Sequence, residues 1–97
     1  MRFGIIVAPE AINDLAGLRS FDSATIRNAI ETHLRHEPTK QSKSRIKQLR
    51  GVRSPQYRLR VGEFRVFYDV LDREVHVLAV VSKAGANEWL RQFGRPT

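Results

Sequence analysis

The segment from Tyr57 to Ser82 constrains the fold most, because polar and apolar residues alternate along much of it with the period of a half-buried strand. Two short breaks, Gly62-Glu63 and Asp72-Arg73, divide the segment into three runs. Each break suits a tight two-residue turn, and Gly62 supplies the positive φ that a type II′ hairpin turn needs. The segment therefore predicts a three-stranded antiparallel meander.

The first turn sets which residues lie opposite each other in the meander. It pairs Arg60 with Arg65 and gives the first two strands one wholly apolar face, formed by Tyr57, Leu59, Val61, Phe64, Val66, Tyr68 and Val70. The opposite face carries Arg58, Arg60, Arg65, Phe67 and Asp69. On the third strand we expect Val75, Val77, Ala79 and Val81 to join the apolar face. We expect its other side chains to lie beside the arginines: His76, Leu78, Val80 and Ser82.

Arginines directly opposite one another weaken a sheet, because like charges repel. Strand charges are usually just the solvated side of an amphipathic sheet. Here only Glu63, in the turn, balances Arg58, Arg60 and Arg65, so we favour a binding site for a polyanion on this face. Asp69 and His76 face each other nearby, and we interpret them as a cross-strand ion pair rather than an acid-base dyad.

The charge of the whole chain supports an anionic partner. The formal net charge is +7 and the pI is about 10.8, which favours nucleic acid or an acidic protein as partner. Basic residues concentrate between positions 38 and 65, where Glu63 is the single acid. The basic residues from Lys43 to Arg50 are explained equally well by contact with phosphates and by a solvent-exposed connector. The candidate nucleic-acid-binding residues there, which would contact RNA if the partner is RNA, are Lys43, Arg45, Lys47, Arg50 and Arg53.

The size and composition indicate one intracellular domain. The 97 residues suffice for a single core, spanning 1–97. The absence of cysteine excludes disulfides and thiolate chemistry. No segment has membrane-spanning length and no signal-peptide pattern is present, so we expect a cytoplasmic protein without a membrane partner. His33 and His36 have no further ligand cluster near them in sequence, so we expect neither a metal nor a cofactor.

The segments around the meander predict an α+β fold. Arg2 to Val7 reads as a buried strand, and Pro9 starts a helix. Its narrow apolar face is traced by Ile12, Leu15, Ala16 and Arg19 and extended by Leu18. Asp22 is the expected cap of a second helix, which Phe21 staples and which ends before Pro38. Its apolar stripe consists of Ile26, Ala29, Ile30, His33 and Leu34. The order is thus an N-terminal strand, a two-helix hairpin, the meander and a short C-terminal helix anchored by Trp89.

This order, together with a series of short motifs, resembles the RelE/ParE superfamily of bacterial type II toxins. The motifs are Leu49-Arg50-Gly51, Tyr57-Arg58-Leu59-Arg60-Val61 and Phe64-Arg65-Val66-Phe67-Tyr68-Asp69-Val70. For a RelE-like member the resemblance implies an endoribonuclease that cuts messenger RNA in the A site of the small ribosomal subunit and so inhibits translation. A cognate acidic antitoxin silences it. ParE-like members instead poison DNA gyrase, and an inactive chain that only binds antitoxin is a further alternative.

The resemblance also implies a set of catalytic residues: Arg58, Arg60, Arg65 and Lys83. They would assist attack of a ribose 2′-hydroxyl on the adjacent phosphate, which gives a cyclic phosphate and a free 5′-hydroxyl. Arginine suits the binding and neutralisation of the transition state but not proton transfer, because it stays protonated. Where RelE-like enzymes usually carry a further arginine and a terminal aromatic residue, this chain has Ala84 and Leu90.

An antitoxin would need apolar contacts as well as charge. The sequence predicts apolar patches around Phe67, Leu78 and Val80 on the arginine face, rimmed by positive charge. An amphipathic acidic segment would suit them, with carboxylates for the arginines and apolar side chains for the patches.

Overall fold

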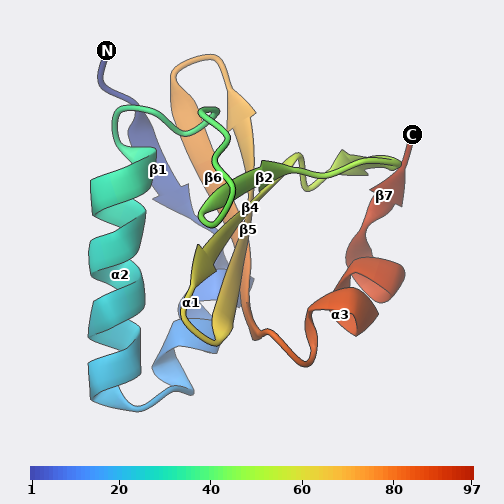
Figure 1. Ribbon diagram of the computed structural model, residues 1–97. Coiled ribbons are helices and arrows are strands. Elements are labelled where there is room, and N and C mark those ends of the chain that lie inside the picture. The colour runs from blue at the N-terminus through green and yellow to red at the C-terminus, as the bar shows by residue number, and fades with distance from the viewer.

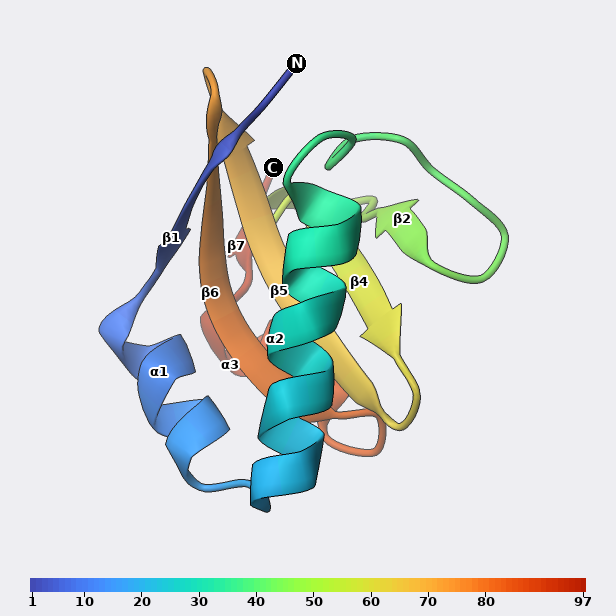
Figure 2. The same cartoon turned by 90° about the vertical axis from the view of Figure 1, so that its left-hand side faces the viewer.

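The computed structural model describes residues 1–97 and contains one main sheet with helices on both faces (Figure 1). The sheet has the strand order β1-β6-β5-β4-β2, in which β1 runs parallel to β6 and the other pairs are antiparallel. Two helices, α1 and α2, cover one face, and α3 lies on the other (Figures 1 and 2). The elements are β1 (Gly4–Val7), α1 (Pro9–Ala16), α2 (Ser20–Leu34), β2 (Ile46–Gln48), β3 (Val52–Ser54), β4 (Tyr57–Val61), β5 (Phe64–Leu71), β6 (Glu74–Ser82), α3 (Ala86–Phe93) and β7 (Arg95–Pro96).

The β4–β5 hairpin has the predicted register. Arg60 pairs with Arg65, and all five residues of β4 lie opposite the expected partners in β5. Both tight turns are present, with φ of +57° at Gly62 and +56° at Asp72. The two strands therefore separate an apolar face, which packs against α1 and α2, from a face with arginines.

A bulge in β6 makes part of the third-strand prediction wrong. Tyr68 pairs with Val77 while Phe67 pairs with Ala79, so Leu78 is an extra residue without an opposite partner. Beyond the bulge, the β6 residues lie on the faces opposite to those predicted. Val80 and Ser82 pair with core-face residues of β5, and Ala79 and Val81 lie on the arginine face. The Asp14 carboxylate of α1 accepts a hydrogen bond from the Val80 amide at 2.9 Å and so holds the bulge.

The core contains the α2 stripe and the apolar side of the sheet. Ile26, Ile30 and Leu34 are buried as predicted. The prediction for α1 was wrong in part. The helix ends at Ala16, before Leu18 and Arg19. It buries Ala11 together with Leu15 and leaves Ile12 48% exposed.

The predicted start of α2 was also wrong. The helix begins at Ser20, two residues before the expected cap, and no side chain caps it. Asp22 instead forms an ion pair with Arg19 at 3.6 Å. Phe21 is 81% exposed and does not staple the first turn.

Three short strands were not predicted. The basic segment expected to be a surface connector contains β2, which pairs with β4 and forms one edge of the sheet. Further along, β3 pairs with β7, which fastens the C-terminal end of the chain to the loop before β4.

The expected ion pair between Asp69 and His76 does not form, although the two residues are cross-strand neighbours. Asp69 accepts hydrogen bonds from the Ser54 hydroxyl at 2.6 Å and the Gln56 amide at 2.7 Å. His76 contacts Glu74 instead, at 3.3 Å. None of the helices has the length and apolar character needed to cross a membrane. No three His, Asp or Glu side chains gather as a metal site would require.

Candidate nucleic-acid interface

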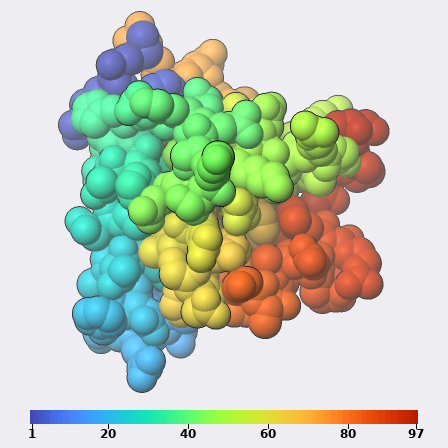
Figure 3. Space-filling view, viewed as in Figure 1, coloured from blue at the N-terminus to red at the C-terminus, as the bar shows by residue number.

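An open cleft of about 700 Å³ lies between the arginine face of the sheet and α3. Figure 3 shows it as the hollow between the green and yellow surface of β2 and β4 and the red surface of α3. We call it the basic cleft, because its lining contains five cations and no acidic residue. It is lined by Lys47, Gln48, Leu49, Arg50, Arg58, Arg65, Phe67, Lys83, Ala86, Asn87 and Leu90.

Sheet register brings the cations of the cleft together. Lys47 of β2 lies opposite Arg58 of β4, which lies opposite Phe67 of β5, so one row crosses three strands. Arg65 is two residues before Phe67 and points to the same side. Lys83 follows the end of β6, where its backbone amide donates to the Glu63 carbonyl at 2.8 Å.

Arg65 is the most firmly held of these cations. Arg65 is only 7% exposed. Its Nη1 donates to the carbonyls of Gly62 at 3.0 Å and Phe64 at 2.9 Å. No carboxylate pairs with it, and none of the salt bridges in the structure involves a cation of the cleft. The positive charge in the cleft is therefore not neutralised within the chain.

Arg58 experiences this concentration of charge directly. Burial lowers the pKa of the Arg58 guanidinium, and the charges of Arg65 and Arg60 lower that pKa further. A bound anion would compensate the desolvation of the guanidinium and reduce the repulsion, since it offers opposite charge and hydrogen-bond acceptors.

The structure brings together some of the predicted catalytic and RNA-binding residues but not all. Arg58, Arg65 and Lys83 of the catalytic set line the basic cleft, whereas Arg60 lines a separate shallow pocket. Lys47 and Arg50 of the RNA-binding set join them. The other three, Lys43, Arg45 and Arg53, are exposed and do not line the cleft.

Sequence reasoning missed the contribution of α3 to this cleft. Ala86, Asn87 and Leu90 of α3 form the second wall of the cleft, opposite the sheet. Gln48 and Leu49 line the cleft on the sheet side and were also missed. The amphipathic pattern of α3 predicted a helix, but no sequence signal indicated which face of the sheet it would cover.

The predicted antitoxin patch is not exposed as expected. Phe67 is 1% exposed, because Trp89 stacks on it with ring centroids 5.0 Å apart. Val80 is 5% exposed and belongs to the core, since the bulge turns it away from the arginines. Leu78 is half-buried and lines a different pocket, with Trp89, Phe93 and the acidic side chains of Glu10, Asp14 and Asp69.

The lining of the basic cleft limits its chemistry. Five cations can bind a phosphate and stabilise added negative charge in a transition state. The cleft has no carboxylate or imidazole, so Lys47 and Lys83 are its only side chains able to exchange a proton.

Known toxin families match most of the chain. The family described as the ParE toxin of type II toxin–antitoxin systems, parDE, matches residues 5–86. RelE1 of Methanocaldococcus jannaschii is 33% identical over 88 residues, which are 89% of this chain and 96% of RelE1.

Solved structures share the fold at lower identity. The RelBE2 toxin–antitoxin complex of Mycobacterium tuberculosis contains a chain with a TM-score of 0.67 and 22% identity, covering 84% of this chain and 99% of its own. For the RelB–RelE complex of Methanococcus jannaschii the TM-score is 0.67 and the identity 20%, with 87% and 96% covered. These likenesses confirm the predicted α+β fold class, with its N-terminal strand, helical hairpin, antiparallel meander and C-terminal helix.

Proposed function

The chain belongs to the ParE toxin family and is a toxin of a type II toxin–antitoxin system with a RelE-like fold, and on this premise we propose that its basic cleft binds and cleaves messenger RNA on the ribosome. The observation that carries the proposal is the cluster of Lys47, Arg50, Arg58, Arg65 and Lys83 without a single acidic neighbour in the cleft. Such a cluster suits an RNA phosphate, whose oxygens accept charge-assisted hydrogen bonds.

In the proposed reaction the ribose 2′-hydroxyl attacks the adjacent phosphorus. The O2′–P bond forms and the P–O5′ bond breaks, which leaves a 2′,3′-cyclic phosphate and a 5′-hydroxyl. Arg65 is already fixed by its bonds to Gly62 and Phe64, while its Nε and Nη2 make no hydrogen bond within the chain. Those groups can stabilise the negative phosphorane-like transition state without reordering the side chain.

Proton transfer is the step for which the cleft offers least. The attacking 2′-hydroxyl must lose one proton and the leaving O5′ must gain one. Lys83 would deliver the proton to O5′, a group of the ribosome would take the proton from the 2′-hydroxyl, and Arg58 would contribute charge only. The ribosome would supply whatever further groups the reaction needs, which accounts for a nuclease without a carboxylate or imidazole in its cleft.

Induction of the chain alone in bacteria tests the proposal. Messenger RNA 5′ ends mapped by primer extension should show cuts within translated codons. These cuts should vanish in Arg65→Ala and fall strongly in Arg58→Gln, and they should persist in Arg73→Gln, which changes an exposed cation in the β5–β6 turn. Circular dichroism of each purified variant establishes that it is folded. A folded Arg65→Ala variant that still produces the cuts would overturn the proposal.

A gyrase poison is the second candidate, because the matching family is described as the ParE toxin and the cleft lacks an obvious general base. The basic cleft would then bind an acidic protein surface or DNA rather than RNA. Growth arrest with DNA damage and without cuts in messenger RNA would favour this function. Induction without growth arrest would favour an inactive chain that only binds antitoxin.

The proposed partner in all three cases is an acidic antitoxin. The solved relatives include toxin–antitoxin complexes, and the charge of +7 favours an acidic chain. Because Phe67 and Val80 are buried, the antitoxin would bind the cations of the basic cleft and the exposed side of α3. Isolation from the native host should recover the toxin with such a chain, in a complex that dissociates at high salt. Recovery of the toxin alone would argue against the partner.

A further inference from the structure

A row of arginines continues from the basic cleft to the edge of the sheet. Arg60 is the cross-strand partner of Arg65, and its backbone amide donates to the Arg45 carbonyl at 2.8 Å. Arg65, Arg60 and Arg45 thus sit on three adjacent strand positions, across roughly 10 Å given the usual strand spacing. Arg60 and Arg45 line a shallow pocket together, and neither belongs to a salt bridge.

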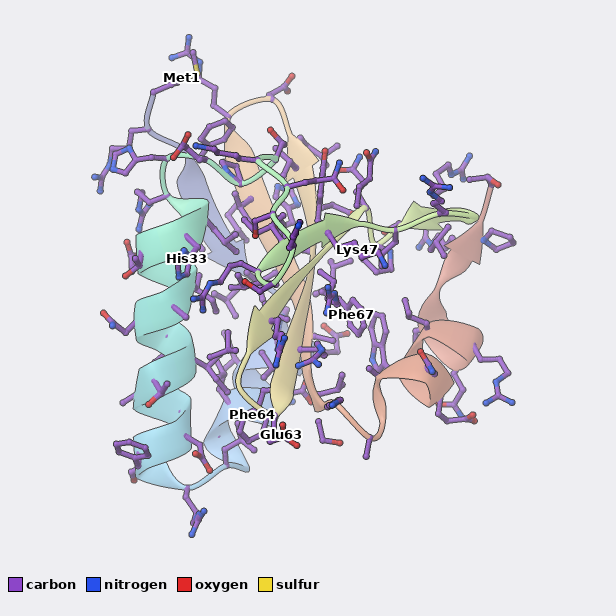
Figure 4. All side chains as sticks on the ribbon, viewed as in Figure 1. Met1, His33, Lys47, Glu63, Phe64 and Phe67 are labelled. Atoms are coloured by element: carbon purple, nitrogen blue, oxygen red, sulfur yellow. The ribbon has the colours of Figure 1, made fainter.

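A second pocket lies around that edge, between the end of α2 and the loop before β2. Its volume is about 310 Å³, and only one of its ten lining residues is hydrophobic. Arg45 lines this pocket too, so it joins the pocket to the arginine row. Figure 4 shows Lys47 and Phe67 on the side of the sheet that faces α3, and His33 on the other side, where α2 faces β2. A ligand that follows the cations therefore passes around the edge of the sheet.

The edge of β2 is closed to a further strand, which limits the kind of ligand. The Ile46 carbonyl accepts from the Ser42 amide at 3.0 Å, and the Gln48 amide donates to the Gln41 side chain at 3.0 Å. The Ile46 amide is satisfied by the Ser42 hydroxyl at 3.3 Å. Because these backbone groups are occupied, recognition here must use side chains rather than strand addition.

The pocket suits a base and ribose better than a phosphate. It lies at the C-terminal end of α2, where the helix dipole disfavours anions, and Glu37 in its lining already pairs with Lys40 at 3.5 Å. Burial, and next the charge of Arg45, lower the pKa of His33, so its imidazole is neutral at pH 7 and offers one donor and one acceptor. Ser44 and Thr32 add hydroxyl groups.

We propose that this pocket binds one nucleotide of the same RNA strand whose reacting phosphate lies in the basic cleft, with Arg60 and Arg45 holding the connecting phosphates. The inference rests on the proposed RNA substrate and adds a second subsite to it. The subsite would contribute to affinity and to sequence preference at a flanking position of the cleaved strand.

Binding of 2′-O-methyl RNA, which cannot be cleaved by this chemistry, tests the subsite at two strand lengths. A dinucleotide occupies only the basic cleft, whereas a strand of about eight nucleotides also reaches the pocket. Arg45→Gln should weaken binding of the longer strand about tenfold, the effect of one charge-assisted hydrogen bond. It should also lower the slope of log affinity against log salt by about 0.7. Binding of the dinucleotide should not change.

A neutral lining residue and a cation outside the lining complete the test. His33→Ala should weaken binding of the longer strand at pH 7.5 without changing its salt slope, because the imidazole carries no charge there. Arg73→Gln removes the same charge from the β5–β6 turn, which lines neither the pocket nor the basic cleft, and should leave the affinity for both strands nearly unchanged.

The outcomes separate this inference from the proposed function. Equal effects of Arg45→Gln and Arg73→Gln on the longer strand, or equal effects of Arg45→Gln on both strands, would reject the subsite and leave RNA binding in the cleft intact. Failure of the unaltered protein to bind either strand at about 50 mM salt would count against the RNA substrate itself.

Discussion

Trp89 of α3 stacks on Phe67 of β5, with ring centroids 5.0 Å apart and ring planes inclined by 10°. Ala86, at 9% exposed, is the only buried residue of α3, so this stack and the β3–β7 pairing hold the helix against the sheet. The second wall of the basic cleft therefore depends on the Trp89 ring together with the β3–β7 pairing.

Trp89→Ala should release α3 and expose Phe67. The expected loss in the free energy of unfolding is about 2 kcal/mol, less than for a fully buried tryptophan, because Trp89 is only half-buried. Urea denaturation measures the loss, and hydrogen exchange of residues 86–93 should quicken. Phe93→Ala is the matched control: its ring also contacts Trp89, at 5.5 Å, but it is 61% exposed. If both variants lose the same stability, the stack does not hold the helix.

Tyr68→Phe should make stability less sensitive to alkaline pH. The buried phenol donates to the Pro38 carbonyl at 2.6 Å, and burial, with a smaller effect of Tyr57, raises the Tyr68 pKa. The unfolded chain therefore loses this proton first, near pH 10. The stabilisation is fully present below that pH and declines by up to about 1.4 kcal/mol per pH unit as pH rises toward the native pKa.

The free energy of unfolding of the variant should be about 1 kcal/mol lower at pH 7, because the Pro38 carbonyl loses the hydrogen bond from the Tyr68 hydroxyl. Above pH 10 its unfolding free energy should fall less steeply than that of the unaltered protein. Urea denaturation across this pH range gives the comparison, with Tyr57→Phe as the variant expected to keep the steep decline. Parallel declines in Tyr68→Phe and the unaltered protein would contradict the assignment.

The features that the sequence predicted correctly depend on residues close together in the chain. The β4–β5 register follows from the alternation of Tyr57 to Val61 and Phe64 to Val70 around one two-residue turn. The stripe of Ile26, Ile30 and Leu34 follows from helical periodicity alone. Arg58 and Arg65 could therefore be placed on one face before the structure was known.

The errors arise where distant segments meet. The bulge at Leu78 is held by Asp14, which is 66 residues away from Val80, so alternation within β6 could not reveal it. Burial of Phe67 depends on where α3 packs. Lys47 and Arg50 line the basic cleft and Arg45 does not, a difference that follows from the position of β2 in the sheet. With only three residues, β2 is too short for a period to be recognised in the sequence.

Asp14→Ala should destabilise the bulge in β6. The Val80 amide would lose its acceptor inside a buried strand, at an expected cost of about 2 kcal/mol. Urea denaturation measures this cost, and the Val80 amide should exchange faster with solvent. Asn13→Ala, at the exposed neighbouring position, should cost much less. A Val80 amide that stays protected in Asp14→Ala would show that the bulge does not need the carboxylate.

Arg60→Gln should stabilise the free protein while it weakens RNA binding. Arg60 lies opposite Arg65 and its charge helps to lower the pKa of Arg58, so its removal relieves repulsion among three guanidinium groups. Like-charge pairs across a sheet cost a few tenths of a kcal/mol to about 1 kcal/mol, so the expected gain is about 0.5 kcal/mol at low salt. The gain should shrink toward 1 M salt, where charges are screened within about 3 Å. Urea denaturation at the two salt concentrations measures it, with Arg73→Gln as the control outside the cluster. A stability loss that does not depend on salt would mean that Arg60 acts through packing and that its charge belongs to the structure rather than to the binding of an anion.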